Sequence, residues 1–295
     1  MTLQQIKILL AVLRNDCNIS KAAKEVYLVQ SALSRQLQLL ESELGSQLFL
    51  RNGKRLVKAT SVCHEVAAQG IVMLNAAANI SNLASPSDET RELRVGTTHT
   101  QARYFLPKIV EKYRTTYPGV KLRFRQGEPS QLITMLYHDQ VDISICSEQI
   151  GKDNGLVSHT CYSWNHVLLN RLDNPIRLKN KQLTLKQLAK MPLVTYMPQF
   201  TGGSTILKTF HQAGLEPQIM FAATDTDVIK TYLRLGLGYG IIIEKGVEEK
   251  DLNEFEVIQL KHLFPSSETK VGWVKGAIQG KHLTHFIDLL IQAKK

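Results

Sequence analysis

The chain has 295 residues, of which 43% are hydrophobic and 21% charged, and its formal net charge is +10. This length is typical of two or three compact domains, and the composition excludes a disordered or collagen-like polymer. The sequence has no signal-peptide pattern and no apolar run of about 18 residues, so we expect a cytoplasmic protein without a membrane partner. The four cysteines lack metal-ligand spacing, which predicts reduced thiols, no bound metal and no cofactor.

The positive charge is concentrated at the N-terminus. Residues 1–60 contain nine Lys or Arg and four Asp or Glu, whereas residues 61–90 contain three acids and no Lys or Arg. The remaining 205 residues carry a surplus of eight positive charges at lower density. A compact basic unit is what contact with the DNA phosphate backbone requires, although a solvated basic surface is the alternative.

Residues 1–60 have the pattern of a winged helix-turn-helix, in which a short helix and a tight turn precede a recognition helix. We expect Ser20 to cap the short helix and residues 27–29 to form the turn. The recognition helix begins at Gln30 or Ser31 and ends at Leu44. Its expected buried stripe consists of Leu33, Leu37, Leu40 and Leu44. A plain three-helix bundle is the alternative.

Polar side chains on the opposite face of this helix have the chemistry of base readout. Arg can bridge O6 and N7 of guanine, and Gln can bridge N6 and N7 of adenine. Asn52-Gly53 then separates two short apolar runs, which predicts a hairpin with basic residues, the wing. The predicted DNA contacts are Ser20, Gln30, Ser31, Ser34, Arg35, Gln38, Arg51, Lys54 and Arg55.

Residues 61–88 are the predicted linker. Thr60 is a suitable N-cap for a helix that extends to about Ala84 and carries almost no charge. Small and apolar residues recur along this helix, alternately four and three residues apart. This heptad-like seam consists of Val66, Gly70, Met73, Ala77, Ile80 and Ala84. We interpret the seam as a dimer interface, and packing of the helix on its own domain is the alternative.

From residue 91 onward, strands and helices alternate, which predicts an α/β domain over residues 89–295 with mostly parallel sheets. We expect two lobes, lobe 1 at about 91–162 and 268–295, and lobe 2 at about 163–267. The expected strands are 93–96, 121–124, 141–146, 167–169, 193–196, 219–221 and 241–243. The expected helices are 105–115, 130–137, 184–189, 204–213, 227–235 and 283–293, of which the last returns to lobe 1.

Three of the expected strands end in similar polar loops, at residues 97–101, 147–148 and 200–204. In open α/β sheets, ligands bind at the carboxyl ends of strands, and helix N-termini there favour anions. The segments 97–101, 147–148 and 201–204 lack Lys and Arg, so neutral hydroxyl, amide and N–H donors would hold an oxyanion. Taken singly, such hydroxyls are more often helix caps, and only their convergence in one cleft indicates a site.

The sequence also shows a family resemblance. Residues 1–60 resemble the DNA-binding domain of the LysR-type transcriptional regulators. The whole chain resembles the CysB-like subgroup, which activates sulfur assimilation and cysteine biosynthesis. The resemblance lies in residues 97–104, 161–165, 192–196, 200–202 and, over the longest stretch, 223–238.

The resemblance implies a winged helix-turn-helix, a linker helix and a two-lobed effector domain like that of periplasmic binding proteins. It further implies homodimers or homotetramers, contact with double-stranded DNA and RNA polymerase, and an effector such as acetylserine or a sulfur oxyanion. The effector contacts that it implies are Thr98, Thr100, Gln101, Ser147 and Thr201. The chain departs from the subgroup at Ser147, where relatives usually have Thr, and at Gly203, where Arg is common in close relatives.

An enzyme and a solute-binding transport protein are the alternative classes. The sequence lacks Gly-x-Ser-x-Gly, P-loop and His-Glu-x-x-His motifs. Residues 236–240 contain three glycines but follow a helix and precede a strand, the reverse of a dinucleotide-binding loop. His282 and His285 have no third ligand nearby in sequence. The basic N-terminal unit argues against a transport protein, so the sequence predicts a regulator without catalytic activity.

Overall fold

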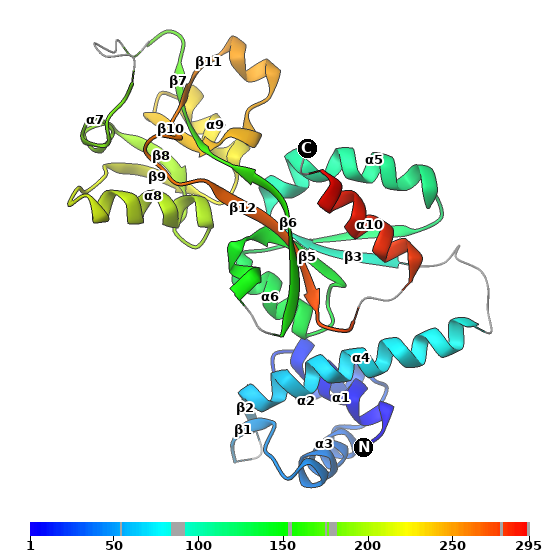
Figure 1. Cartoon of the computed structure of the whole chain (residues 1–295). Helices are drawn as coiled ribbons and strands as arrows, with labels where there is room; N and C mark the ends of the chain where they lie inside the picture. The colour runs from blue at the N-terminus through cyan, green and yellow to red at the C-terminus, as the bar shows by residue number, and fades with distance from the viewer. Residues whose placement is uncertain are drawn as a thin grey trace.

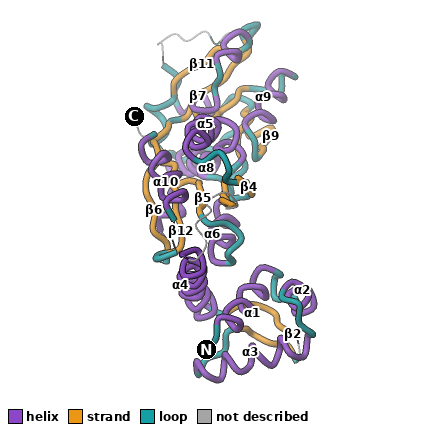
Figure 2. Tube along the Cα trace, turned by 90° about the vertical axis from the view of Figure 1, so that its right-hand side faces the viewer, coloured by secondary structure: helices purple, strands orange, loops and turns teal. Residues whose placement is uncertain are grey.

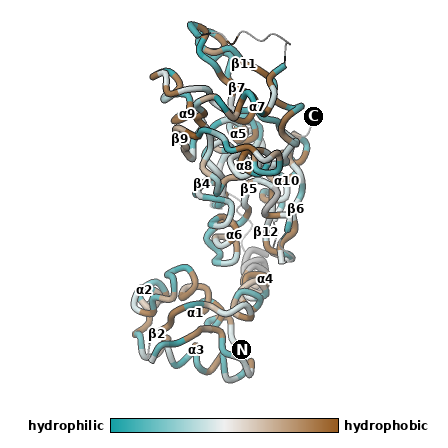
Figure 3. Tube along the Cα trace, turned by 90° about the vertical axis from the view of Figure 1, so that its left-hand side faces the viewer, coloured by the Kyte–Doolittle hydropathy of each residue, from teal (hydrophilic) through white to brown (hydrophobic). Residues whose placement is uncertain are grey.

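The computed structural model describes residues 1–53, 55–83, 92–152, 155–174, 176, 182–277 and 280–293. A mainly helical N-terminal domain lies at one end of the molecule, and the long helix α4 lies between this domain and the first of two α/β lobes (Figure 1). Figures 2 and 3 show from opposite sides that lobe 1 separates the N-terminal domain from lobe 2. No helix in the described segments is long and apolar enough to span a bilayer.

The N-terminal domain has the predicted order of helix, turn, helix and wing. Its elements are α1 (Leu3–Arg14), α2 (Ile19–Glu25), α3 (Gln30–Leu44), β1 (Phe49–Asn52) and β2 (Arg55–Ala59). Two details of the prediction are wrong. The N-cap of α2 is Asn18, whose side chain accepts a hydrogen bond from Lys21 N, because the helix begins one residue before Ser20. Leu44 is 38% exposed, because it is the last residue of α3 before the chain turns at Gly45 with a φ of 63°.

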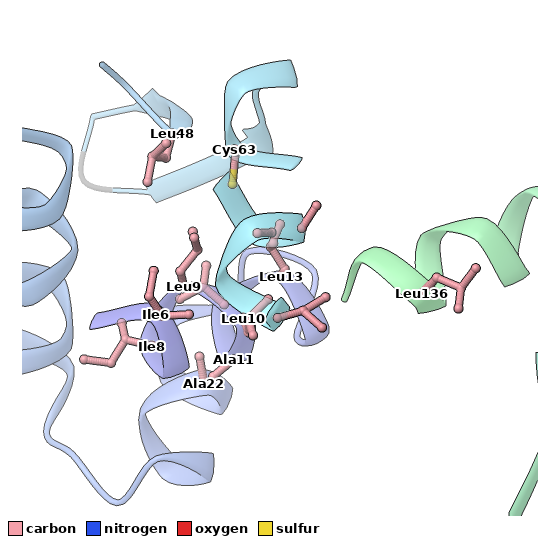
Figure 4. Packing of buried hydrophobic residues seen from close by; sticks show 14 of the residues in the cluster. Ile6, Ile8, Leu9, Leu10, Ala11, Leu13, Ala22, Leu48, Cys63 and Leu136 are labelled. Carbon is pink, nitrogen blue, oxygen red and sulfur yellow. The ribbon is translucent and has the colours of Figure 1, made fainter. Parts of the chain in front are cut away.

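The core of this domain forms around α1, which is buried on most of its circumference. Ile6, Leu9, Leu10 and Leu13 of α1 pack with side chains from α2, the segment before the wing, and α4 (Figure 4). Leu136 of lobe 1 belongs to the same apolar cluster. The N-terminal domain and lobe 1 therefore share buried apolar surface, which is the main favourable contribution to their association.

Helix α4 (Ser61–Leu83) has the predicted cap, since Cys63 N donates to Thr60 Oγ1 over 3.2 Å. The first half of the predicted seam faces its own chain. A Cβ at Gly70 would lie 2.6 Å from Cγ2 of Ile6, so the small residue lets α4 pack closely on α1. The intrachain alternative is therefore correct for this half of the helix. Ile80 is 71% exposed and remains available to a partner, whereas Ala84 lies outside the described residues.

A short turn of lobe 1 completes the junction with the N-terminal domain. His138 stacks on His64 of α4, with ring centroids 6.0 Å apart. Asp139 pairs with Arg14 over 3.5 Å, and Gln140 donates to the Arg14 carbonyl. Burial, together with the neighbouring His64, lowers the pKa of His138 to about 4, so the stacked ring is neutral at physiological pH.

Lobe 1 is a five-stranded sheet in the order β4-β3-β5-β12-β6. Its strands are β3 (Glu92–Thr97), β4 (Lys121–Gln126), β5 (Ile143–Ser147), β6 (Leu156–Trp164) and β12 (Ser267–Val274). Its helices are η2 (Gln101–Phe105), α5 (Leu106–Thr116), α6 (Pro129–Tyr137), η3 (Glu148–Lys152) and α10 (Lys281–Gln292). As expected, the final helix α10 returns to lobe 1, where it packs on α5, β6 and β12.

Lobe 2 is a second five-stranded sheet, in the order β11-β7-β10-β8-β9. Its strands are β7 (His166–Arg171), β8 (Leu193–Tyr196), β9 (Ile219–Ala223), β10 (Tyr239–Ile243) and β11 (Phe255–Gln259). Its helical segments are α7 (Leu185–Ala189), α8 (Thr201–Gln212), α9 (Thr226–Arg234), η4 (Glu244–Gly246) and η5 (Glu249–Asn253).

The prediction of mostly parallel sheets is wrong. In each lobe two strand pairings are parallel and two are antiparallel. The antiparallel pairings involve β6, β7, β11 and β12, at the two places where the chain crosses between the lobes. A chain that crosses from one sheet into the other reverses direction within each, which strand-by-strand patterning does not reveal.

The exposed end of α4 predicts a specific effect on assembly. Glutamate at Ile80 is compatible with the isolated chain, because Ile80 is 71% exposed. In an apolar dimer seam the same carboxylate would be an unpaired buried charge, which is strongly unfavourable. We expect Ile80→Glu to shift the protein toward monomers in sedimentation, whereas Ile80→Leu retains assembly. Unchanged assembly of Ile80→Glu would contradict the seam.

Candidate DNA-binding surface and effector cleft

The N-terminal domain presents a groove of about 940 Å³ between α2, α3 and the wing. Four of the predicted DNA contacts line it, namely Ser20, Gln30, Ser31 and Ser34. Arg35 and Gln38 are exposed on α3 but do not line this groove. The opposite face of α3 packs in the core of the domain, since Leu33, Leu37 and Leu40 are at most 1% exposed.

The wing residues fall into two groups. Arg51 forms an ion pair with Glu41, and the Glu41 carboxylate also accepts hydrogen bonds from Leu48 N and Phe49 N. Arg51 thus fixes the base of the wing to α3 with its charge balanced. Lys54 lies outside the described residues, and Arg55 is described only as the first residue of β2.

Sequence reasoning missed several residues that line the groove, among them Asn15, Asp16, Asn18, Lys21 and Asn52. The turn between α1 and α2 contains two non-glycine residues with positive φ, Asp16 at 50° and Cys17 at 62°. This strained backbone brings Asn15 and Asn18 beside α3. Only a structure shows such a turn, because neither residue is of the glycine type that signals it in sequence.

A second site lies between the two lobes, where a cavity of about 40 Å³ is lined by all five predicted effector contacts. Thr98, Thr100 and Gln101 follow β3, Ser147 ends β5, and Thr201 begins α8 after β8. The three polar strand ends therefore converge, as the carboxyl-end rule predicts. Phe200 and Gly202 of the predicted loop 200–204 also line the cleft, and the lining residues that sequence reasoning missed are Pro129, Trp164, Tyr196, Thr224, Ile243 and Thr269.

Hydrogen bonds join the two lobes across this cleft. Ser147 Oγ contacts Thr201 Oγ1 directly, so the end of β5 touches the start of α8. Thr226 Oγ1 of α9 lies 3.4 Å from Thr100 Oγ1 of lobe 1 and 2.7 Å from the Tyr196 hydroxyl. On the lobe 1 side, Gln101 is held by Tyr162, whose hydroxyl donates to Gln101 Oε1 over 2.5 Å.

Helix α8 directs its N-terminus at the cleft and begins at Thr201, three residues before the predicted start. Its N-cap Phe200 offers no side-chain acceptor, so the first N–H groups are left for another acceptor. A Cβ at Gly203 would overlap the carbonyl oxygens of Tyr196 and Met197, and glycine is therefore required for this approach. Any larger residue at position 203 would therefore require a different turn.

Two buried groups near the cleft have an unused hydrogen-bonding atom. Among the described residues, Trp164 Nε1 and His166 Nδ1 are buried without a partner. Trp164 lines the cleft, so its indole N–H is a further donor there. Burial lowers the pKa of His166 to about 4 despite a hydrogen bond to the Gly202 carbonyl, so the ring is neutral at physiological pH. An unpaired buried donor is costly, and a ligand acceptor would satisfy it.

Comparison with known proteins identifies the family. Residues 3–64 match the model of the bacterial regulatory helix-turn-helix protein, lysR family, and residues 86–295 match the LysR substrate binding domain. The chain belongs to the LysR family of transcriptional regulators. The family is non-enzymatic, and the chain has no catalytic role by this relationship.

Among curated relatives, the transcriptional regulator Cbl of Klebsiella aerogenes is 36% identical over 291 residues, 98% of this chain and 92% of that protein. SsuR of Burkholderia cenocepacia is 35% identical over 291 residues, 98% of this chain and 94% of that protein. CysB of Haemophilus influenzae is 35% identical over 290 residues, 98% of this chain and 89% of that protein. CysB is among these relatives, which confirms the resemblance to the CysB-like subgroup of LysR-type regulators.

Two solved structures confirm the α/β fold class with its N-terminal helix-turn-helix and two-sheet effector domain. The cofactor-binding domain of the Cbl regulator superposes with a TM-score of 0.65 and 36% identity, covering 69% of this chain and 89% of that domain. A full-length OxyR variant from Pseudomonas aeruginosa gives a TM-score of 0.73 over 99% of this chain and 98% of that one. At 19% identity, OxyR shows the fold alone.

Proposed function

We propose that this LysR-type regulator activates genes of sulfur assimilation or cysteine biosynthesis in response to a small anionic sulfur-pathway effector. In this proposal, residues 1–60 bind promoter DNA, residues 61–88 dimerise, and residues 89–295 bind the effector. The active form is a homodimer or homotetramer that contacts RNA polymerase at the promoter. The relationship to Cbl, SsuR and CysB supports the gene class, and the chemistry of the cleft supports the effector class.

One observation carries the effector proposal: every described side chain that lines the cleft is uncharged. Thr98, Thr100, Gln101, Ser147 and Thr201 offer hydroxyl and amide donors, and the N-terminus of α8 adds N–H groups. Each hydrogen bond to a charged acceptor contributes about 1.5–3 kcal/mol, so several neutral donors can hold an anion. The helix dipole adds a smaller favourable term.

The size of the cleft bears on the choice of effector. Its volume is about 40 Å³, and one water requires roughly 10–15 Å³ on the same measure. A tetrahedral sulfur oxyanion is therefore of suitable size for the cleft as it stands. Acetylserine is larger and would require the lobes to separate at the contact of Ser147 with Thr201.

For the DNA-binding surface, we propose two kinds of contact. Ser20, Gln30, Ser31, Ser34, Arg35 and Gln38 face the major groove, where Arg35 and the glutamines have the chemistry of base readout. Arg51, Lys54 and Arg55 contact the phosphate backbone, which gives affinity without sequence preference. Because Arg51 is paired with Glu41, it must exchange the Glu41 carboxylate for a phosphate group in order to contact DNA.

The exposed position of Arg35 yields a test of the recognition helix. Arg35→Ala removes an exposed side chain, and we expect a loss of roughly 1–3 kcal/mol in operator binding with little change for random duplex. Titrations of both duplexes at several salt concentrations measure this difference. Lys186→Ala, which removes an exposed charge on α7 of lobe 2, is the control. Equal losses on operator and random DNA would reject the proposed base contact.

The hydroxyls of the cleft yield a test of the effector site. Thr201→Ala and Thr100→Ala each remove one donor, and we expect affinity for sulfate, thiosulfate or acetylserine to fall severalfold to about a hundredfold. DNA binding in the absence of effector should be retained. Thr209→Ala is a matched control, because Thr209 lies in the same helix as Thr201 but bonds the Thr205 carbonyl. Calorimetry in which all variants bind as tightly as the wild type would place the effector elsewhere.

A further inference from the structure

The two longest sequence motifs of the subgroup resemblance, residues 97–104 and 223–238, meet across the lobes. The second motif supplies none of the five proposed effector contacts, and Thr224 is its one residue in the described cleft lining, so effector binding accounts for little of the motif. In the structure, Nδ1 of His99 in lobe 1 lies 3.6 Å from Oδ2 of Asp225 in lobe 2. Beside this pair, the Thr100 hydroxyl reaches Thr226 at 3.4 Å. The motif is thus placed against the loop that supplies Thr98, Thr100 and Gln101.

Asp227 of α9 is the centre of a larger set of contacts. It accepts a hydrogen bond from the Tyr104 hydroxyl over 2.5 Å and another from Arg103 Nε over 3.2 Å. The Arg103 guanidinium also donates to both carboxylate oxygens of Glu248, at 3.1 and 3.2 Å. Arg103 and Tyr104 belong to η2 of lobe 1, so every one of these bonds crosses between the lobes.

A buried ion pair supports Tyr104 from within lobe 2. Lys230 is 1% exposed and Asp251 is fully buried, with Lys230 Nζ 2.5 Å from Asp251 Oδ2. The same ammonium donates to the Tyr104 hydroxyl over 3.3 Å and lies 5.0 Å from the centroid of the Tyr104 ring. A buried charge pair of this kind is costly to form but tolerates few geometries, so it holds Tyr104 in one position.

The electrostatics of Asp227 agree with this geometry. Burial alone would raise its pKa, but the hydrogen bond from Tyr104 and the charges of Lys230 and Arg103 outweigh burial and lower the pKa. Asp227 is therefore ionised at neutral pH, where its bonds to Arg103 and Tyr104 are charge-assisted.

These contacts act on the segment that carries the effector contacts. Gln101, Arg103 and Tyr104 share the short π-helix η2, and Thr100 is its N-cap. A π-helical turn is a local distortion that tertiary contacts must maintain. Fixing Arg103 and Tyr104 against lobe 2 therefore also fixes Thr100 and Gln101 at the cleft.

We propose that Arg103, Tyr104, Asp227, Lys230 and Glu248 form an inter-lobe clasp, in which Arg103, Tyr104 and Asp227 are positioning residues that hold the cleft closed and set effector affinity. None of the five lines the cleft, so they act through Thr100 and Gln101. The effect on affinity depends on the proposed effector site, whereas the effect on lobe closure does not.

The clasp is tested with Arg103→Gln, Asp227→Asn and the double variant. Arg103 and Asp227 side chains are 46% and 44% exposed, so these changes should leave folding intact. We expect each single change to weaken sulfate and acetylserine binding by about threefold to tenfold. The fold-loss of affinity in the double variant should be smaller than the product of the two single fold-losses, because the two side chains contact each other. Asp173→Asn is the control, because Asp173 pairs with Arg171 within lobe 2.

A distance measurement separates the clasp from the effector site. Spin labels at Thr116→Cys of α5 and Lys208→Cys of α8, in a Cys17→Ser background, report the separation of the lobes. We expect one narrow distance distribution in the otherwise unmodified chain and in Asp173→Asn, and a broader, longer distribution in both clasp variants. If sulfate and acetylserine fail to bind the wild type while the distribution still broadens, the clasp stands and the effector proposal falls. An unchanged distribution in both clasp variants overturns the clasp.

Discussion

The contact between the Ser147 and Thr201 hydroxyls is the interaction on which the proposed function depends most. It brings the end of a lobe 1 strand to the first residue of a lobe 2 helix, so it exists only when the two lobes are closed. That approach requires Gly203, where any side chain would strike the carbonyl oxygens of Tyr196 and Met197. A single glycine thus decides how closely the N-terminus of α8 reaches the cleft.

The cleft is also connected structurally to the N-terminal domain. Helix α6 places Pro129 in the cleft wall at its first residue. The turn after its last residue places His138 on His64 of α4 and Asp139 beside Arg14 of α1. One short, rigid helix therefore contacts both the proposed effector site and the domain proposed to bind DNA. A displacement of α6 at the cleft would also displace its contacts with α4, because close-packed interiors transmit strain.

Much of this arrangement can be predicted from sequence, for identifiable reasons. The pattern predicts the recognition helix over its observed length because Leu33, Leu37 and Leu40 mark its buried face and Gly45 its end. The polar loops after β3 and β5 are expected to lie together because these neighbouring parallel strands share a carboxyl edge, whereas the loop after β8 belongs to the other sheet and meets them where the lobes face each other. The sequence pattern does not predict strands β6, β11 and β12. Their burial depends on partners far away in the chain, as when Ser267 pairs with Trp164.

Other features depend on tertiary contacts that no local pattern records. The spacing on α4 indicates a partner chain, yet Gly70 is small because Ile6 of the same chain packs on it. Trp164 and Tyr196 belong to motifs of the subgroup resemblance, but the sequence does not place them in the cleft, since each belongs to a strand and turns inward only in the folded sheet. The proposed role of Asp227 and Lys230 can be recognised only once both lobes are placed relative to each other, because their contacts with Arg103 and Tyr104 cross between the lobes.

In the proposed function, an anion bound in the cleft and DNA bound on α3 influence each other's binding through a single chain. The most direct measurement is a linkage experiment with duplexes from the organism's own sulfur-acquisition promoters, titrated with and without saturating sulfate or acetylserine. Effector binding is then measured with and without saturating DNA. We expect at least one effector to change promoter affinity, and the promoter to change the affinity for that effector by the same factor. Promoter affinity that is independent of every effector bound in the cleft would contradict this proposal.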